Sequence, residues 1–486
     1  MARLTSVWCT LWAFFLVQRG DSEAVPLSVT PQSCKFAVVG GGWAGIYAAW
    51  RVVVDEKIYN GSDVCLFEAS GRFGGRTYTV FADEFPQLEG LNLDIGAYRF
   101  AFQQHLPADL LRGPLNMSTG CYIPSCKPDP LDDNLVLHRL VDPTSRVSIG
   151  YGSALGVMMQ QLSTRGVHML LHHKLDAIYA LGEHDVKLLW NEGSAISEKV
   201  THADVVFLNL PRHGLNNLAP DSVVFKESPA LTQELFTCTA ENYGNESKEA
   251  AVKVYLIYED AWWLTILGLK EGEVHSLSTD PPVYIRYHDG PTHCQGGRCR
   301  GALLVQYAHT LKEGSGWYMK FQPDVTEPKG LFTEGPLLTQ IHQKLLQMHA
   351  AMLRSKGVDP DQLAGPVAAL VGFWPHSKKV VLAPSPDPLS FSTHNLPACV
   401  NGMSSAKYWK QIRKPVASRQ IFLANNDWWL EQSGIDLMPP YWAEVSLRTA
   451  ERVLHDHMGL SPPRWLNSTY FHRSVLGQHW TEELLV

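Results

Sequence analysis

A glycine cluster at the end of an apolar run constrains the fold of this chain more than any other feature. Residues 36–39 are apolar, and the glycines that follow fit the pattern G-x-G-x-x-G at Gly40, Gly42 and Gly45. A helix-compatible stretch then covers residues 46–54, and a second apolar strand, residues 64–67, ends at Glu68. Such glycines let the backbone and a helix N-terminus approach a pyrophosphate, while the acid can accept a hydrogen bond from a ribose hydroxyl. The order of these parts predicts a Rossmann-like unit that binds a dinucleotide.

A second glycine pair stands directly behind the acid, in the run Gly71-Arg72-Phe73-Gly74-Gly75-Arg76-Thr77. Cationic side chains and a second close backbone approach suit a long cofactor that is already seated on the first loop. The two runs together resemble the flavin-containing amine oxidase superfamily, and most closely its secreted L-amino acid oxidase-like branch. The resemblance implies non-covalent FAD as the cofactor, with contacts from Gly40, Gly42, Trp43, Ala44, Gly45, Glu68, Ala69, Arg72, Gly74, Gly75 and Arg76.

The resemblance also implies an α/β fold, in which a Rossmann-like FAD-binding domain is interleaved with an α+β substrate domain built on a mixed sheet. We predict a signal peptide at 1–24, FAD-binding parts at 25–100, 150–211 and 396–460, an irregular connecting segment at 101–149, a substrate domain at 212–395 and a C-terminal tail at 461–486. In the second FAD-binding part, a backbone group near Leu175 is expected to meet the adenine end of the cofactor.

Composition is consistent with a secreted two-domain protein. The 486 residues, with a hydrophobic share of 45%, suffice for two cores, and the net charge of -7 argues against nucleic acid as a partner. Residues 1–24 have the charge, apolar centre and small-x-small end of a signal peptide, with an uncleaved anchor as the alternative. No later stretch is long enough to span a bilayer. Sequons at Asn60, Asn116, Asn245 and Asn467 accord with glycosylation.

Eight cysteines remain once removal of the leader takes Cys9. The pairs near enough in sequence for local disulfides are Cys121–Cys126 and Cys294–Cys299. Cys65 lies inside an apolar strand and is predicted to be a buried free thiol. No C-x-x-C pair occurs, so no metal site is predicted.

Arg99 ends the run Asn92-Leu93-Asp94-Ile95-Gly96-Ala97-Tyr98-Arg99. This run resembles the L-amino acid oxidase branch, where an arginine grips the substrate carboxylate. The planar guanidinium suits that task because it matches a carboxylate with two parallel hydrogen bonds. Arg99 is therefore predicted to clamp the substrate carboxylate, while a structural pairing with Asp94 or a position facing the flavin stays open. The chain departs from the branch at Ala97 and Tyr98, where Gly and Met are usual.

Lys253 is a single lysine in the β-prone run 250–258. Both faces of the run are apolar, so Lys253 is predicted to be at least half buried, with a lowered pKa. The run resembles the family's lysine strand, whose lysine holds a water against flavin N5, and this implies a catalytic role. The alternative is a strand lysine that extends its amine to solvent.

Residues 415–426 and 441–451 resemble the family's closing segment, in which a strand, a Gly-acid pair and a helix meet the flavin. The resemblance implies cofactor contacts at Asn425, Asn426, Trp442 and Ala443, and Trp442 is also predicted to face the substrate. Asn425 stands where Gly is usual and Asn426 where Glu is usual. Asn tolerates a left-handed backbone, and its amide can bind ribityl hydroxyls, so flavin binding is expected to survive. The effect on turnover stays open.

These features predict a secreted FAD-dependent oxidoreductase that oxidises the α-C–N bond of an L-amino acid or related amine. Its partners are a small molecule with a carboxylate, an amine or both, and O2, which becomes H2O2; a homodimer stays open. The first alternative is an FAD-dependent isomerase or desaturase of an unsaturated fatty acid, whose carboxylate Arg99 would grip. The second is a secreted flavin-binding protein without turnover.

Overall fold

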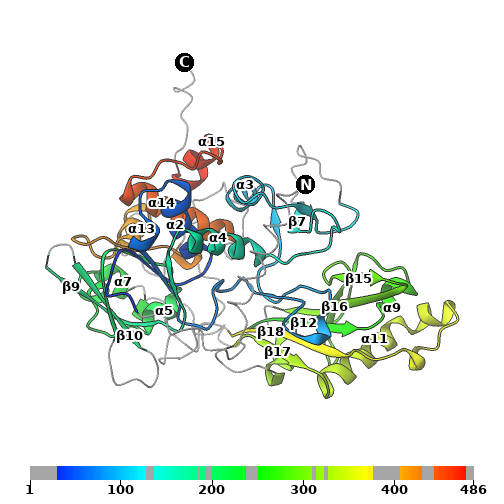
Figure 1. Cartoon of the computed structure of the whole chain (residues 1–486). Coiled ribbons are helices and arrows are strands. Elements are labelled where there is room, and N and C mark those ends of the chain that lie inside the picture. The colour runs from blue at the N-terminus through cyan, green and yellow to red at the C-terminus, as the bar shows by residue number, and fades with distance from the viewer. Residues whose placement is uncertain are drawn as a thin grey trace.

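The computed structural model describes residues 30–126, 136–182, 185–191, 199–233, 235–236, 250–308, 314–321, 327–375, 405–428 and 443–477. Within these ranges, two seven-stranded sheets, each with its own helices, lie at opposite sides of the view in Figure 1. No helix within these ranges is both long enough and apolar enough to cross a bilayer.

The first sheet joins strands from distant parts of the chain. Its order is β8-β2-β1-β11-β10-β9, and β19 pairs with β11. The strands are β1 (Ser33–Val39), β2 (Val64–Phe67), β8 (His168–Leu170), β9 (Lys174–Leu181), β10 (Asp185–Asn191), β11 (Lys199–Leu208) and β19 (Ile421–Leu423). The pairs among β1, β2, β8, β11 and β19 are parallel, whereas β9, β10 and β11 form an antiparallel meander. Apolar cores cover both faces of the parallel half, as in Rossmann-like sheets.

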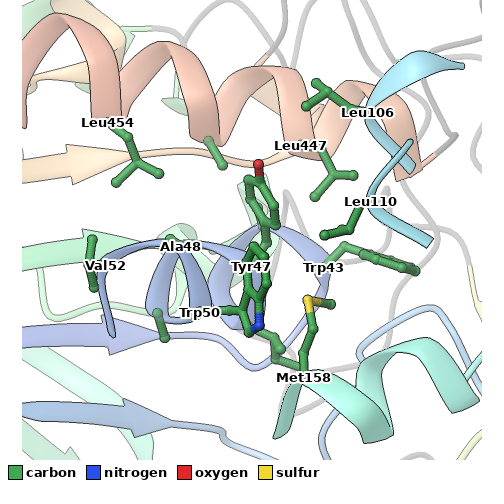
Figure 2. Close-up of a cluster of buried hydrophobic side chains, with 14 of the residues drawn as sticks. Trp43, Tyr47, Ala48, Trp50, Val52, Leu106, Leu110, Met158, Leu447 and Leu454 are labelled. Atoms are coloured by element: carbon green, nitrogen blue, oxygen red, sulfur yellow. The ribbon is translucent and has the colours of Figure 1, made fainter. Parts of the chain in front are cut away.

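One face of this sheet carries a helical layer built around α2. Its helices are α2 (Trp43–Trp50), α3 (His105–Arg112), α4 (Ser153–Thr164) and α14 (Ala443–Met458). Figure 2 shows Tyr47 and Trp50 of α2 among apolar side chains that include Met158 of α4 and Leu447 of α14. The first and last segments of the predicted FAD-binding domain therefore share one core.

The other face is covered by α5 (Arg212–Asn216), α6 (Val223–Lys226), α7 (Pro229–Gln233) and α13 (Ser405–Arg413). Leu215, Val224 and Leu231 belong to the core beneath them, although the prediction began the substrate domain at residue 212. Part of the predicted C-terminal tail packs as well: Leu466 and Phe471, which flank α15 (Ser468–Tyr470), join the core around α2. Both segments pack here because they cover apolar surface that the strands alone leave open.

The second sheet has the order β13-β14-β16-β12-β18-β17, and β15 pairs with β16. Its strands are β12 (Ala250–Tyr258), β13 (Glu273–Ser276), β14 (Val283–Arg286), β15 (Thr292–Gln295), β16 (Arg298–Ala308), β17 (Lys329–Phe332) and β18 (Ala368–Pro375). We predicted a mixed sheet for the substrate domain, but every pairing among these described strands is antiparallel. The first sheet is the one that combines parallel and antiparallel pairs. No buried crossover helix is needed between such strands, and short connections suffice.

Each face of the second sheet packs on a different layer. The helices α9 (Trp262–Thr265), α10 (Ser315–Tyr318) and α11 (Pro336–Ser355) share one core with it. The opposite face packs on the segment that follows the second glycine motif, through the hairpin β3 (Thr79–Val80) and β4 (Leu93–Asp94). A smaller sheet, β5 (Phe100–Ala101), β7 (Leu137–Leu140) and β6 (Thr119–Cys121), continues from that segment. Residues 78–101 thus connect the glycine loops to the second sheet.

Within the part of the chain that the structure describes, disulfides join three cysteine pairs. Cys121–Cys126 and Cys294–Cys299 are bonded as predicted. Cys65 is not the free thiol that we predicted, because it is bonded to Cys34 with a Cα–Cα separation of 6.0 Å. The parallel pairing of β1 and β2 brings the two residues together, and a pattern read along a single strand does not contain that pairing.

Candidate active site

A cavity lies where the carboxyl ends of the parallel strands meet the second sheet. The residues that follow four strand ends line it: Gly40 after β1, Glu68 after β2, Asn209 after β11 and Asn425 after β19. Parallel α/β sheets bind their ligands at this edge. The second sheet contributes the opposite wall through Ala251 and Lys253 of β12, Tyr307 of β16 and Trp374 of β18. The cavity therefore runs from the glycine loops to the face of the second sheet.

The first glycine loop has the backbone geometry that a pyrophosphate requires. Gly40 is left-handed, with φ of +101°, and a Cβ atom there would come within 2.4 Å of the Asn209 carbonyl oxygen. A Cβ atom on Gly45 would come within 2.1 Å of the Gly40 carbonyl oxygen, so strand and helix approach this closely only with glycine. Helix α2 begins directly after Gly42, without a capping side chain or an acidic residue in its first turn. Its N-terminal N–H groups and positive dipole end fit the phosphates of a dinucleotide.

Glu68 ties the two glycine loops together. Its Oε2 accepts a hydrogen bond from the Gly41 N–H at 2.7 Å, and its Oε1 accepts one from the Ser70 N–H at 2.9 Å. The Gly74 N–H donates to the Gly41 carbonyl at 2.7 Å. The predicted cofactor residues that line the cavity are Gly40, Gly42, Trp43, Glu68, Ala69, Gly74, Gly75, Arg76, Leu175, Asn425, Asn426 and Ala443.

Three predicted cofactor residues lie elsewhere. Ala44 and Gly45 are within α2 and are not among the residues that line the cavity. The Arg72 guanidinium donates to the carbonyls of Gly75 at 2.5 Å and Phe73 at 3.3 Å, and it stacks 3.9 Å from the ring centre of Tyr78. Arg72 therefore stabilises the second glycine loop, because its N–H groups donate to carbonyls of that loop. It does not line the cavity, although we predicted it to contact the cofactor.

The closing segment meets the second glycine loop through Arg76. Its Nη2 donates to the side-chain carbonyls of Asn425, at 3.2 Å, and Asn426, and its Nη1 lies 3.6 Å from the buried Asp427 carboxylate. The Asn425 amide donates to Asn209 Oδ1 at 2.9 Å. Asn425 does not adopt the left-handed backbone that its replacement of glycine suggested. Ala443 begins α14 at the cavity, whereas Trp442 lies outside the described residues.

Lys253 is buried, with 2% of its surface exposed. Its Nζ donates to the carbonyls of Asp94 at 3.1 Å and Gly96 at 2.6 Å, and it lies 3.4 Å from the ring centre of Tyr98. Burial lowers the pKa of Lys253 well below its ordinary value, although the nearby Asp94 carboxylate opposes that shift. The amine therefore does not extend to solvent, which removes the alternative left open by the sequence.

Arg99 is half-buried and is not among the residues that line the cavity. Its guanidinium stacks on two aromatic rings, 4.8 Å from the ring centre of Tyr98 and 4.9 Å from that of Tyr122. Since Lys253 contacts the same Tyr98 ring, Arg99 lies one side chain away from the cavity lining. The structure thus brings Arg99 close to Lys253 without placing it on the cavity wall described above.

Several residues that line the cavity were not predicted from the sequence. Asn209 directly follows β11, and its amide donates to the Gly40 carbonyl at 3.0 Å. Its place at the carboxyl end of a parallel strand is a signal that could have identified it. Tyr307 and Trp374 lie on separate strands of the second sheet, and His173 precedes β9. Tyr307 and Trp374 carry no local pattern, because the packing of the two sheets places them at the cavity. His173 is held at the edge of the first sheet, where its N–H donates to the Glu68 carbonyl at 2.9 Å.

Comparisons with known proteins place the first part of the chain among dinucleotide-binding domains. Residues 38–108 match the NAD(P)-binding Rossmann-like domain. Aplysianin-A of Aplysia kurodai is 34% identical over 74 residues, which are 15% of this chain and 12% of that protein. Achacin of Lissachatina fulica is 38% identical over 88 residues, which are 18% of this chain and 15% of that protein. The matches therefore span only a small part of these relatives' own length.

Solved structures extend the likeness to most of the chain. Putrescine oxidase bound to putrescine is 13% identical, with a TM-score of 0.51 over 89% of this chain and 100% of that one. A triple mutant of the same enzyme is 14% identical, with a TM-score of 0.51 over 88% and 99%. The fold defines a protein with a Rossmann-like dinucleotide-binding domain. More particularly, the chain shares its fold with putrescine oxidase over most of its length, which agrees with the fold that the sequence motifs predicted. Together with the cavity geometry, the Rossmann-like match supports a dinucleotide as the cofactor.

Proposed function

We propose that this chain is an FAD-dependent oxidoreductase of the amine or L-amino acid oxidase type. The single observation that carries the proposal is the continuity of one cavity from the dinucleotide loops to buried Lys253. In the proposed reaction an L-amino acid, O2 and water become a keto acid, ammonia and H2O2. Bound FAD would supply the hydride acceptor and the reaction with O2.

The chain's own residues have distinct proposed roles. The N-terminus of α2 would hold the pyrophosphate, Glu68 a ribose hydroxyl, and the backbone near Leu175 the adenine end. Asn426 would bind the ribityl chain as donor or acceptor. Lys253 would hold a water or move a proton at its Nζ, since a buried amine with a lowered pKa gives up its proton more readily than an ordinary lysine.

Secretion and glycosylation remain part of the proposal. The asparagines of three sequons, Asn60, Asn116 and Asn467, are exposed, and the fourth, Asn245, lies outside the described residues. The three disulfides also suit an oxidising compartment. The predicted signal peptide lies outside the described residues as well.

A second candidate is an FAD-dependent isomerase or desaturase of an unsaturated fatty acid. The observation that favours it is the Asn425–Asn426 pair, which changes the usual closing segment and is bound to Arg76. Substrate-dependent H2O2 release would support the oxidase, whereas a double-bond shift without O2 uptake would support the isomerase. A flavin-binding protein without turnover would show neither.

The purified protein should be yellow and should show flavin absorption. The expectation follows from the glycine geometry at Gly40 and Gly45 and from the α2 N-terminus. Denaturation followed by filtration should release FAD into the filtrate. A folded but colourless preparation that takes up no added FAD would refute the cofactor, and flavin retained on the denatured chain would refute non-covalent binding.

Arg99→Ala should weaken the binding of carboxylate substrates far more than that of neutral amines of similar size. Loss of a charged bidentate contact is expected to cost about 2–4 kcal/mol. The measurement is kcat/KM for matched amino-acid and amine pairs, with Arg146→Ala as the control because Arg146 binds the Thr119 carbonyl at an exposed site. Equal losses for both substrate classes would show that Arg99 supports Tyr98 and Tyr122 instead of clamping a carboxylate.

A further inference from the structure

Tyr98 links Lys253 to a buried carboxylate on the second sheet. The Lys253 Nζ lies 3.4 Å from the centre of the Tyr98 ring and 5.0 Å from that of Tyr307. The two rings meet edge to face, with centres 5.8 Å apart, so both lie beside the amine, and Tyr98 is the nearer. At the far end of Tyr98, its hydroxyl donates to Asp289 Oδ2 at 3.5 Å.

The Asp289 carboxylate is buried and has several polar partners. Asp289 lies between β14 and β15, and its side chain is fully buried. The Tyr122 hydroxyl donates to Oδ1, and Arg286 Nη1 lies 3.7 Å from Oδ2 and 3.4 Å from the Tyr98 hydroxyl. The Arg139 guanidinium, which donates to the carbonyls of Tyr122 and His288, fixes the surrounding backbone. A buried carboxylate with this many partners is a built feature of the cluster.

Neither cofactor binding nor the chemistry proposed above requires Asp289, and it does not line the cavity. We propose that Asp289 is a positioning residue for Lys253: by accepting the Tyr98 hydroxyl, it fixes and polarises the ring on which the Lys253 ammonium lies. This inference rests on the proposed role of Lys253 as the group that handles protons. A carboxylate acceptor makes the phenol more electron-rich, and a more electron-rich ring holds a cation more strongly.

The charges around Lys253 determine how strongly its contact with the Tyr98 ring affects its pKa. Burial lowers the pKa of Lys253, the Asp94 carboxylate raises it, and Arg99 and Arg286 lower it further. The ring contact and the two carbonyls act with Asp94 to favour the proton on the amine. Burial also raises the pKa of Asp289 to about 7, while Arg99 opposes the rise and Asp94 adds to it. Two further titratable groups lie in the cluster. His288 is neutral near pH 7, because burial lowers its pKa to about 4, and Glu273 pairs with Arg286 at 3.1 Å.

These charges determine how ionisation of Asp289 affects the pKa of Lys253. Above about pH 7, Asp289 is ionised and polarises Tyr98, so the Lys253 pKa is at its highest. Replacing Asp289 with a neutral side chain removes that polarisation, so Lys253 should lose its proton at lower pH. Removing the Tyr98 hydroxyl alone should have the same effect, since the ring remains but its link to Asp289 is lost.

The test measures the Lys253 titration directly in the full-length protein. NMR of protein labelled with 13C-lysine follows the chemical shift of the Lys253 ε-methylene over a series of pH values, with Lys253→Met to assign the signal, and gives the titration midpoint of this buried amine without any turnover. Asp289→Asn and Tyr98→Phe should each lower the midpoint by about one pH unit. The double variant should show no further shift, because both changes interrupt the same link. Glu84→Gln, which removes a carboxylate bound to Lys329 of the same sheet, should leave the midpoint unchanged.

Two results would overturn the proposal: an unchanged midpoint in Asp289→Asn, or an equal shift from Asp289→Asn in the Tyr98→Phe background. If Asp289→Asn does not fold, Tyr98→Phe decides, since it leaves the buried charges intact. The proposed function is judged separately, by FAD content and H2O2 release of the wild-type protein. A Lys253 shift in a protein without turnover would uphold the link and refute the oxidase.

Discussion

Lys253→Met is expected to leave the cofactor bound and to slow turnover by about ten-fold or more, in the range lost with a positioned proton-transfer group. Methionine keeps much of the volume of the stem but removes the amine that contacts the Asp94 and Gly96 carbonyls and the Tyr98 ring. The free energy of unfolding should change little, because the cost of burying the ammonium disappears together with its hydrogen bonds. Stopped-flow absorbance would follow flavin reduction by substrate and reoxidation by O2 as separate rates.

Lys329→Met is the matched control for this change. Lys329 lies on β17 of the same sheet, its Nζ is 2.7 Å from Glu84 Oε2, and it does not line the cavity. The control should leave both rates near those of the wild type. If Lys253→Met also leaves both rates unchanged, Lys253 has only a structural role, in which its amine binds the carbonyls of Asp94 and Gly96.

Glu451→Ala should lower the free energy of unfolding by about 3 kcal/mol, as expected when one partner of a buried ion pair is removed. Glu451 Oε1 accepts from Arg51 Nε at 2.7 Å and from the Tyr47 hydroxyl at 2.6 Å, and the Arg51 and Glu451 side chains are fully buried. The change would leave Arg51 with Asp55 and Glu56 as its remaining acidic partners, which keeps the loss near the lower end of the usual range. Urea denaturation followed by circular dichroism would measure it.

A neighbouring exposed pair on the same helix provides the control. Arg452 Nε lies 2.5 Å from Asp456 Oδ2, and both side chains are about a quarter exposed, at 25% and 29%. Asp456→Ala should therefore cost only about 0–1 kcal/mol. Because Glu451 joins α14 to α2, its loss should also weaken FAD binding, whereas the control should not. Equal effects of the two substitutions would mean that the buried pair does not stabilise the contact between the first and last segments.

The sequence alone determined those features of the protein that depend on residues close together in the chain. Gly40 requires a left-handed backbone and Gly45 a close helix approach, and both demands appear as glycine at a fixed spacing. Glu68 ends a strand that pairs with β1, so the sequence order alone brings it back to the glycine loop. The unbroken apolar run around Lys253 likewise predicted its burial.

Tertiary structure decided what depends on pairing between distant strands. The Cys34–Cys65 bond, the antiparallel character of the second sheet and the packing of residues 212–233 on the first sheet all depend on spatial neighbours that a local sequence pattern does not identify. The meeting of Lys253 with residues 94–98, more than 150 positions away in the sequence, is of the same kind. Such contacts arise because each sheet must cover its apolar faces with whatever segments the chain can bring there, and side chains from separate segments then share one cavity wall.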